Sequence, residues 1–304
     1  MTTTETTMST HTPQACAPEL TREVLATLEG ATDARFKHIM SELVTRLHDF
    51  VRAVDLKPEE WIQAIEFLTA TGKACDPKRQ EFILLSDTLG VSMLVVALAQ
   101  SRASATGATP ATEATVQGPY YWEGAPERAL GDDLGEGVPG EPAFYSGRVL
   151  DTEGRPLAGA LLDIWSGDGE GVYDMQMEGN DQMLARGRIR TDAEGRYWFW
   201  SIRPSYYPIP MDGPVGRMID RLGRDPNRPG HIHMIVSAPG HVPVTTHLFV
   251  SDSPYLDTDV VFGVRPALVV PFGKKPAGTA EDGRTMTRPY WTAQYDFRLA
   301  PQRG

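Results

Sequence analysis

Residues 186–202 have the sequence RGRIRTDAEGRYWFWSI. Two runs suited to β-strands, residues 186–190 and 197–202, flank Asp192-Ala-Glu-Gly195, and Asp and Gly between such runs are typical of a tight turn. We therefore predict a β-hairpin here. Residues 144–150, 160–165, 231–237, 244–250 and 290–299 predict further strands, separated by turns rich in Gly and Pro. Many short strands without helices between them favour a β-sandwich or barrel over a parallel sheet.

The chain changes character near residue 100, because the apolar residues before that point follow a helical period. From Asp33 to Val54 they recur every three or four residues, which predicts a long amphipathic helix. Further helices are expected at residues 20–28 and 58–72, in a region that opens at Asp76-Pro77 and carries the apolar residues 82–85, and at residues 91–98. Residues 101–115 have the composition of a linker. The predicted fold class is α+β, with a disordered tail (1–19), an all-helical domain (20–100), a linker (101–115) and an antiparallel β-sandwich domain (116–304).

Composition narrows the class of protein. The chain has 304 residues, 41% hydrophobic and 23% charged, as in an ordinary folded protein. Its net charge of −11 disfavours binding to nucleic acid or an anionic membrane by bulk charge. The two cysteines, Cys16 and Cys75, cannot form a disulfide framework or a structural zinc site by themselves. No stretch resembles a signal peptide or a membrane span, so we expect a cytoplasmic protein.

The best local signal of chemistry is His231-Ile-His233 within a predicted strand. Residues two apart in a strand point to the same face, so both imidazoles can bind one metal ion. An isolated pair of this kind is also compatible with a solvated strand face. Residues 234–239 contain no carboxylate, which argues against a two-histidine, one-carboxylate ferrous site, and no zinc hydrolase motif is present. The remaining oxygen donors near turns are tyrosines, notably Tyr173 and Tyr207.

The order Tyr173, Tyr207, Arg228-Pro-Gly-His231-Ile-His233 resembles the intradiol ring-cleavage dioxygenases, non-haem ferric enzymes that cleave catechols between the two hydroxyls. Several flanking segments match the family as well: Leu162-Asp-Ile-Trp165, Arg190-Thr-Asp-Ala-Glu-Gly-Arg196, Asp212-Gly-Pro214 and Ser237-Ala-Pro-Gly240. The resemblance implies that the sandwich is the catalytic domain. It also implies that the helical part is a dimerisation or linker domain.

The resemblance further implies a ferric ion, Fe(III), held by Tyr173, Tyr207, His231 and His233. In the family pattern Tyr207 and His233 are axial ligands, and Tyr207 also takes or relays a substrate proton. Arg228 would stabilise negative charge during the reaction. His247 would lie beside the ligands, at a position where catechol 1,2-dioxygenases usually carry glutamine.

Within the family the chain is most similar to the branch that cleaves hydroxyquinol (1,2,4-trihydroxybenzene) to 3-hydroxy-cis,cis-muconate, which tautomerises to maleylacetate. Asp87 stands where this branch has an acid facing the third hydroxyl, and Tyr207-Pro-Ile-Pro210 is also similar. Gln117 and Tyr120 depart from the residues expected in that branch. The resemblance implies a substrate pocket formed by Leu84, Asp87, Val116, Gln117, Gly118, Pro119 and Tyr120.

Two alternatives stay open. Catechol or a chlorocatechol is the alternative substrate, and a metal-free β-sandwich binding module is a more remote interpretation. The expected partners are a small aromatic diol and O2, with no nucleic acid. By resemblance we also expect a homodimer formed through the helical domain, with a phospholipid at its interface.

Overall fold

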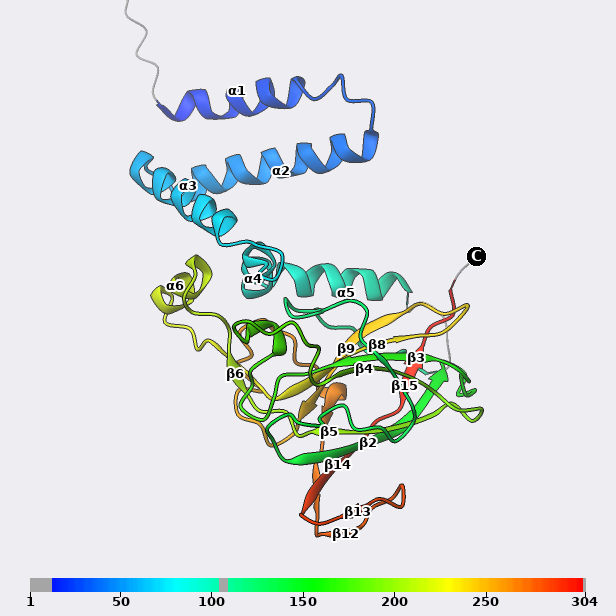
Figure 1. Cartoon of the computed structure of the whole chain (residues 1–304). Helices are drawn as coiled ribbons and strands as arrows, with labels where there is room; N and C mark the ends of the chain where they lie inside the picture. The colour runs from blue at the N-terminus through cyan, green and yellow to red at the C-terminus, as the bar shows by residue number, and fades with distance from the viewer. Residues whose placement is uncertain (1–12, 104–108, 303–304) are drawn as a thin grey trace, which may run out of the picture. The chain divides into compact units, whose positions relative to one another are not determined.

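The computed structural model describes residues 13–103 and 109–302 (Figure 1). Contacts divide the chain into two compact units, one up to Thr69 and one from Ala70. This boundary falls inside the range 20–100 that the sequence suggested as one helical domain. The helices are α1 (Pro13–Ala26), α2 (Ala34–Ala53), α3 (Pro58–Lys73), α4 (Glu81–Thr88), α5 (Val91–Ala103) and α6 (Pro214–Arg221), with short 3₁₀ helices η1 (Asp174–Gln176) and η2 (Pro266–Leu268).

The first unit contains α1, α2 and most of α3. Helix α1 begins at Pro13, so the predicted tail is wrong for residues 13–19, whereas residues 1–12 lie outside the described part of the chain. Helix α2 begins after Asp33, whose carboxylate accepts the N–H of Phe36 at 2.9 Å. Figure 1 shows α1 and α2 side by side. Helix α2 has no buried residue and exposes an apolar face formed by Phe36, Ile39, Leu43, Leu47, Phe50 and Val51.

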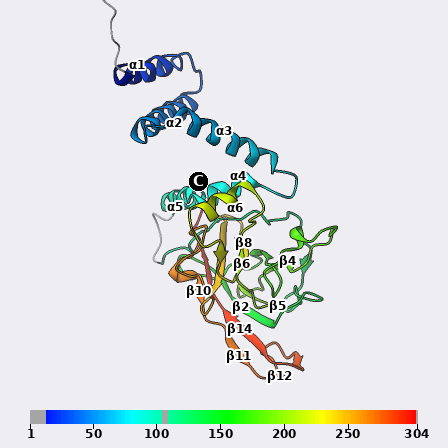
Figure 2. The ribbon, with the colours of Figure 1, turned by 90° about the vertical axis from the view of Figure 1, so that its left-hand side faces the viewer.

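Helices α4 and α5 belong to the second unit, because their polar groups bond to the sandwich side of the chain. The buried carboxylate of Glu81 accepts the N–H of Val215 at the start of α6 (3.0 Å). The side-chain amide of Gln100 bonds Thr112 O and Ala114 N. Figures 1 and 2 show α5 and α6 over the same end of the sandwich. In the described residues no single helix is long and apolar enough to span a membrane, although α4 and Val91–Arg102, bent by 73°, reach that length and composition together.

The predicted linker also differs from the structure. Helix α5 extends to Ala103, and residues 104–108 lie outside the described ranges. Residues 109–115 run along the sandwich, where Thr112 N bonds Arg298 O and Thr115 N bonds Thr245 O, both at 2.9 Å. This segment is therefore attached by backbone hydrogen bonds and is not a free connection.

Two sheets form the predicted sandwich, and the fold class is confirmed. One sheet has the order β1-β4-β3-β8-β9-β10, and the other has β11-β14-β2-β15 with β5 paired to β2. The pairs β4–β3, β3–β8, β8–β9, β2–β5 and β11–β14 are antiparallel, whereas β1–β4, β9–β10, β14–β2 and β15–β2 are parallel. The strands of the two sheets are β1 (Glu127–Arg128), β2 (Pro142–Asp151), β3 (Leu161–Trp165), β4 (Arg186–Arg190), β5 (Arg196–Ile202), β8 (His231–Ser237), β9 (Val244–Val250), β10 (Val269–Val270), β11 (Gly273–Lys275), β14 (Tyr290–Gln294) and β15 (Phe297–Leu299). Two small ribbons pair β6 (Tyr207–Pro208) with β7 (Asn227–Arg228) and β12 (Gly278–Thr279) with β13 (Thr285–Met286).

The predicted hairpin at residues 186–202 is wrong. Both strands exist, and the turn between them closes through Gly195 N to Asp192 O at 3.1 Å. Strand β4, however, pairs with β3 and β1, whereas β5 pairs with β2 in the opposite sheet. The turn therefore carries the chain from one sheet to the other. Aromatic packing favours this arrangement, because Phe199 on β5 stacks on Tyr145 of β2 with ring centroids 4.9 Å apart.

The single strand predicted at residues 290–299 is two strands. Both β14 and β15 pair with β2 in parallel, and the ladder breaks between them. At the break the N–H of Arg148 bonds the carboxylate of Asp296 at 2.9 Å instead of a backbone carbonyl. At this position of the ladder a side-chain carboxylate has thus replaced a backbone carbonyl as the hydrogen-bond acceptor.

Candidate functional site

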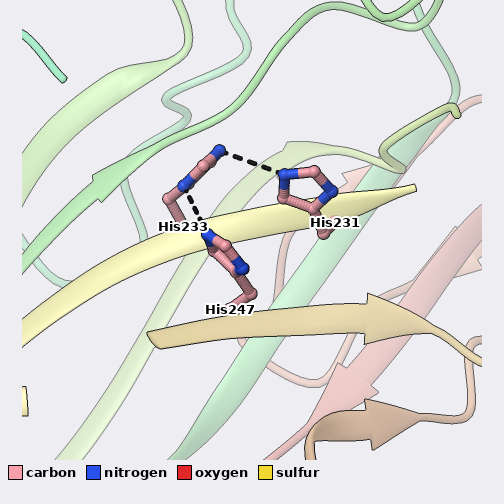
Figure 3. Close-up of side chains that lie close together, drawn as sticks. All are labelled: His231, His233 and His247. Atoms are coloured by element: carbon pink, nitrogen blue, oxygen red, sulfur yellow. Dashed lines mark hydrogen bonds between the residues drawn. The ribbon is translucent and has the colours of Figure 1, made fainter. Parts of the chain in front are cut away.

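Strand β8 supplies the two histidines of the site. Ile232 and Met234 belong to the core between the sheets, so His231 and His233 leave the opposite face of the strand. Both histidines are only 1% exposed. Their Nε2 atoms lie 3.1 Å apart. The close-up in Figure 3 marks this contact with a dashed line. The fully covered histidine pair contradicts the interpretation of a solvated strand face.

Tyr173 reaches the histidines from the glycine-rich loop after β3. The loop is folded on itself by Asp168, whose carboxylate accepts the N–H of Val172 at 2.9 Å. The N–H of Tyr173 donates to the side chain of Gln176 in η1, also at 2.9 Å. Gly171 has φ +86°, and a Cβ there would lie 2.6 Å from Cβ of Tyr207. Glycine is thus required where the two tyrosine segments cross.

Tyr207 is placed by the small ribbon of β6 and β7. Its register partner in this ribbon is Arg228, so the tyrosine and the arginine lie next to each other. Both are buried, with exposed fractions of 6% and 3%. Three residues after Arg228 the chain enters β8 at His231. The ribbon therefore brings the second tyrosine to the histidines.

Four side-chain atoms form a closed ring at this point. Tyr173 Oη lies 2.8 Å from His233 Nε2 and 3.2 Å from Tyr207 Oη, and Tyr207 Oη lies 3.4 Å from His231 Nε2. The 3.1 Å separation of the two Nε2 atoms closes the ring. With metal–ligand bonds of about 2 Å, neighbouring ligand atoms lie about 2.8–3.3 Å apart. The spacing of the four atoms therefore fits a shared metal ion.

The protonation of the four groups suits the same interpretation. His231 Nδ1 donates to Pro229 O at 2.7 Å, which leaves the lone pair of Nε2 facing the ring. Burial, and then the charge of Arg228, lowers the pKa of His231 to about 3. Burial likewise lowers the pKa of His233 and raises the pKa of both tyrosines. Ionising both buried phenols requires a strong local positive charge, which a metal cation supplies.

Arg228 is held by a carboxylate that sequence reasoning missed. Its Nε lies 3.1 Å from Asp259 Oδ1, and its Nη1 lies 3.0 Å from His231 Nε2. The side chains of Arg228 and Asp259 are 4% and 2% exposed. This contact holds the pKa of Asp259 below its usual value although burial opposes the shift. Asp259 lies far along the chain from Arg228 and follows no local motif, so the sequence offered no signal for it.

His247 lies behind His233. The two residues are register partners on β9 and β8, and His247 Nε2 lies 2.8 Å from His233 Nδ1. His233 thus presents one nitrogen to the ring and the other to His247 (Figure 3). His231, His233 and His247 have the spacing of a three-histidine metal cluster. Because His233 faces the other two with different nitrogens, His247 lies on the side of His233 that points away from the ring.

The seven predicted pocket residues fall into different environments. Leu84, Pro119 and Tyr120 line a pocket of about 510 Å³, and the ring of Tyr120 stacks on Tyr173 with centroids 4.5 Å apart. Gly118 approaches His233 closely, because a Cβ at this glycine would lie 3.4 Å from Cε1. Val116 is buried with Leu84 in a second apolar cluster.

The two polar residues among the seven differ in burial. Gln117 is exposed. Asp87 is 2% exposed, and its burial raises the pKa of its carboxyl group, while a hydrogen bond to the Ser92 side chain and then the charge of Arg228 oppose the shift. Asp87 is thus a buried acid within the electrostatic reach of Arg228.

Two family profiles cover most of the sequence. The profile described as dioxygenase matches residues 116–301, and the one described as catechol dioxygenase N terminus matches residues 33–107. The chain belongs to the intradiol dioxygenase family. The 6-chlorohydroxyquinol 1,2-dioxygenase of Cupriavidus pinatubonensis is 47% identical over 282 residues, which are 93% of this chain and 96% of the relative. The hydroxyquinol 1,2-dioxygenase of Nocardioides simplex is 43% identical over 289 residues, 95% of this chain and 97% of the relative.

A solved structure extends the likeness to the fold of this intradiol dioxygenase. Hydroxyquinol 1,2-dioxygenase from Pseudomonas putida DLL-E4 matches with a TM-score of 0.85 and 45% identity, covering 95% of this chain and 100% of that one. The chain is therefore an enzyme that cleaves aromatic diols, and the metal-free binding module is excluded as its function.

Proposed function

We propose that this chain is a ferric intradiol dioxygenase that cleaves hydroxyquinol, with Tyr173, Tyr207, His231 and His233 as the metal ligands. The closed ring of two phenol oxygens and two imidazole nitrogens, at 2.8–3.4 Å, is the observation that carries the proposal. Phenolates are hard anionic donors, and two of them offset most of the charge of Fe(III). The substrate class follows from the names of the relatives and from the buried acid Asp87.

The protein's own groups would act as follows. A ferric ion bound in the ring would serve as a Lewis acid toward the two adjacent oxygens of the diol. Tyr207 Oη, next to Arg228 on the ribbon, would accept a proton from the incoming diol. The guanidinium of Arg228, fixed by Asp259, would stabilise negative charge that develops on the substrate. His247 would keep His233 in the tautomer whose Nε2 lone pair faces the ring.

Asp87 supplies the preference for a third hydroxyl. The buried carboxyl group of Asp87 has a hydrogen bond to the Ser92 side chain but keeps a raised pKa, and a substrate hydroxyl would give it a second hydrogen-bonding partner. Leu84 and Tyr120 would contact the apolar ring, since both line the adjacent pocket. A catechol, which lacks the third hydroxyl, would leave the Asp87 carboxyl without this partner.

The helical unit supports two further proposals, a homodimer and a bound phospholipid. The apolar face of α2 is exposed, and burying such a face stabilises association. A pocket of about 450 Å³ in the same unit has Leu20, Val51 and Trp61 on its wall together with Lys57. Apolar walls with a cation suit an acyl chain and a phosphate. Light scattering and mass spectrometry of extracted lipid test these proposals.

Activity on two diols, combined with iron analysis, tests the proposed function. The purified protein should hold about one iron per chain and show a visible phenolate-to-iron band that shifts when hydroxyquinol is added without oxygen. It should cleave hydroxyquinol faster than catechol. Asp87→Asn keeps an acceptor but removes the charge, and a hydrogen bond to a charged group is worth roughly 1–1.5 kcal/mol more than a neutral one, so this variant should reduce the selectivity about 5- to 10-fold.

The control for Asp87→Asn is Asp220→Asn, which removes an exposed acid on α6. The control should leave the selectivity unchanged. A protein without iron and without the band would overturn the proposed metal site. A wild-type preference for catechol, or unchanged selectivity in Asp87→Asn, would overturn the assignment of hydroxyquinol.

A further inference from the structure

A row of side chains crosses four strands behind the ring. His247 on β9 faces His233 on β8, His233 faces Trp165 on β3, and Trp165 faces Arg186 on β4. Register partners in antiparallel strands point to the same side of a sheet, so all four side chains share one face. Trp165 stacks on His233 with centroids 4.7 Å apart and an angle of 14° between the ring planes. The row thus connects one proposed ligand to β4.

The last residue of the row, Arg186 on β4, contacts the loop that carries Tyr173. Arg186 pairs with Asp174, the residue directly after Tyr173, with its Nε 2.6 Å from Asp174 Oδ2. A second contact joins Arg186 Nη2 to Asp174 Oδ1, so the pair is bidentate. Their side chains are 1% and 0% exposed. Tyr173 and His233 are therefore connected in two ways. They touch directly in the ring, and they are connected indirectly through Trp165 and the buried pair of Arg186 and Asp174.

Asp174 also organises the loop that carries Tyr173. Its carboxylate accepts the N–H groups of Met175 and Leu184, and its carbonyl accepts the side-chain amide of Asn180. Every carboxylate oxygen of Asp174 thus serves both Arg186 and the backbone. The position of the loop relative to β4 is consequently set by one rigid, planar ion pair.

We propose that the Asp174–Arg186 pair positions Tyr173 relative to His233 and so sets the geometry of the tyrosine as a metal ligand. Neither residue touches the ring atoms, so both are positioning residues. The inference rests on the proposed function, because it assumes that Tyr173 binds the metal. A planar guanidinium is needed, since a lysine would carry the charge but not the two parallel contacts.

The test compares variants of the pair with a variant that lowers stability elsewhere on the same strand. Asp174→Asn removes the negative charge of the pair. Arg186→Lys keeps the positive charge but cannot make two parallel contacts. Asp174→Leu combined with Arg186→Met removes both charges together. Ile189→Ala, on the opposite face of β4 and in the core between the sheets, is the control. For each protein the iron affinity, the visible band per bound iron, and kcat and KM are measured.

We expect Asp174→Asn and the double variant to bind iron about 10- to 100-fold more weakly and to show a shifted or weaker band per bound iron. Arg186→Lys should lie between these variants and the wild type. Ile189→Ala should lose thermal stability but keep the wild-type band. The double variant, which leaves no uncompensated charge, separates positioning from misfolding.

The inference is overturned if Asp174→Asn and the double variant keep the wild-type band and iron affinity. It is also overturned if Ile189→Ala alters the band as strongly as they do, because the effect would then reflect stability alone. Absence of the band from the wild-type protein would instead refute the proposed function.

Discussion

Replacing Gly171 with alanine tests whether the crossing of the two tyrosine segments sets the site. The new Cβ would lie 2.6 Å from Cβ of Tyr207 and 3.0 Å from the carbonyl oxygen of Tyr206. Ordinary contact between carbon atoms needs about 3.5 Å, so Tyr207 must move by about 1 Å. In addition, φ +86° at residue 171 costs an alanine about 1–2 kcal/mol of folding free energy.

Gly179→Ala provides a matched control for this substitution. Gly179 lies in the same region, has φ +70°, and a Cβ there would have no atom within 4 Å. Gly179→Ala should therefore lose about 1–2 kcal/mol of unfolding free energy in urea titrations, and Gly171→Ala should lose about 1–3 kcal/mol more because of the steric overlap. Only Gly171→Ala should also change the ligands, because a displacement of about 1 Å at a reacting centre can lower the rate about 100-fold.

The assay is the visible spectrum per bound iron together with kcat for hydroxyquinol. Gly171→Ala should show a shifted or weakened band and a kcat about 100-fold lower, whereas Gly179→Ala should match the wild type in both. If Gly171→Ala kept the wild-type band and kcat while losing the same stability as Gly179→Ala, Tyr207 would not be held by this contact. The reasoning from the crossing of the two segments would then be wrong.

Two other predictions concern the histidines. His247→Gln retains an acceptor for His233 Nδ1–H and should bind iron nearly as well as the wild type, whereas His247→Ala should bind it about 10- to 100-fold more weakly, as iron titration would reveal. Equal affinities of the two variants would argue against the orienting role. Burial lowers the pKa of His231 to about 3 and holds the pKa values of His233 and His247 far below 6.5. As the pH falls below about 6.5, the unfolded metal-free chain therefore takes up more protons than the folded one. The free energy of unfolding of the metal-free protein should therefore fall with decreasing pH, by up to about 1.4 kcal/mol per pH unit for each histidine, and urea titrations at pH 7 and 5.5 that agree would contradict this.

Local periodicity was enough to find most elements. The helical period before residue 100 predicted α2, α3 and α5, and the strand ranges of β4, β8 and β9 were predicted to the residue. The start of α1 was missed because residues 13–19, which include two prolines and no large aliphatic side chain, carry no apolar period. The predicted pair of strands around Asp192 failed for another reason. A turn signal shows that the chain reverses, but it does not show which strand each side will pair with.

The candidate site shows the same division between features set by neighbouring residues and features set by contacts between distant segments. The spacing of His231 and His233, and their order after Tyr173 and Tyr207, carried the resemblance that led to the ligand set. The distances that close the ring, and the burial of all four groups, are properties of the folded chain. Whether a histidine pair is covered by a loop or faces water depends on where that loop packs.

The sequence by itself determined the helical and strand periods, the strand that carries both histidines, and the chemical types of the ring atoms. The tertiary structure decided which sheet β5 joins, the contact of Asp259 with Arg228, and the row that ends at Asp174 and Arg186. The physical reason is that periodicity and turns depend on neighbouring residues, whereas pairing across a sheet and burial of an ion pair depend on packing between segments far apart in the chain. Arg228 and Asp259, for example, are 31 residues apart in the sequence and meet only in the folded chain.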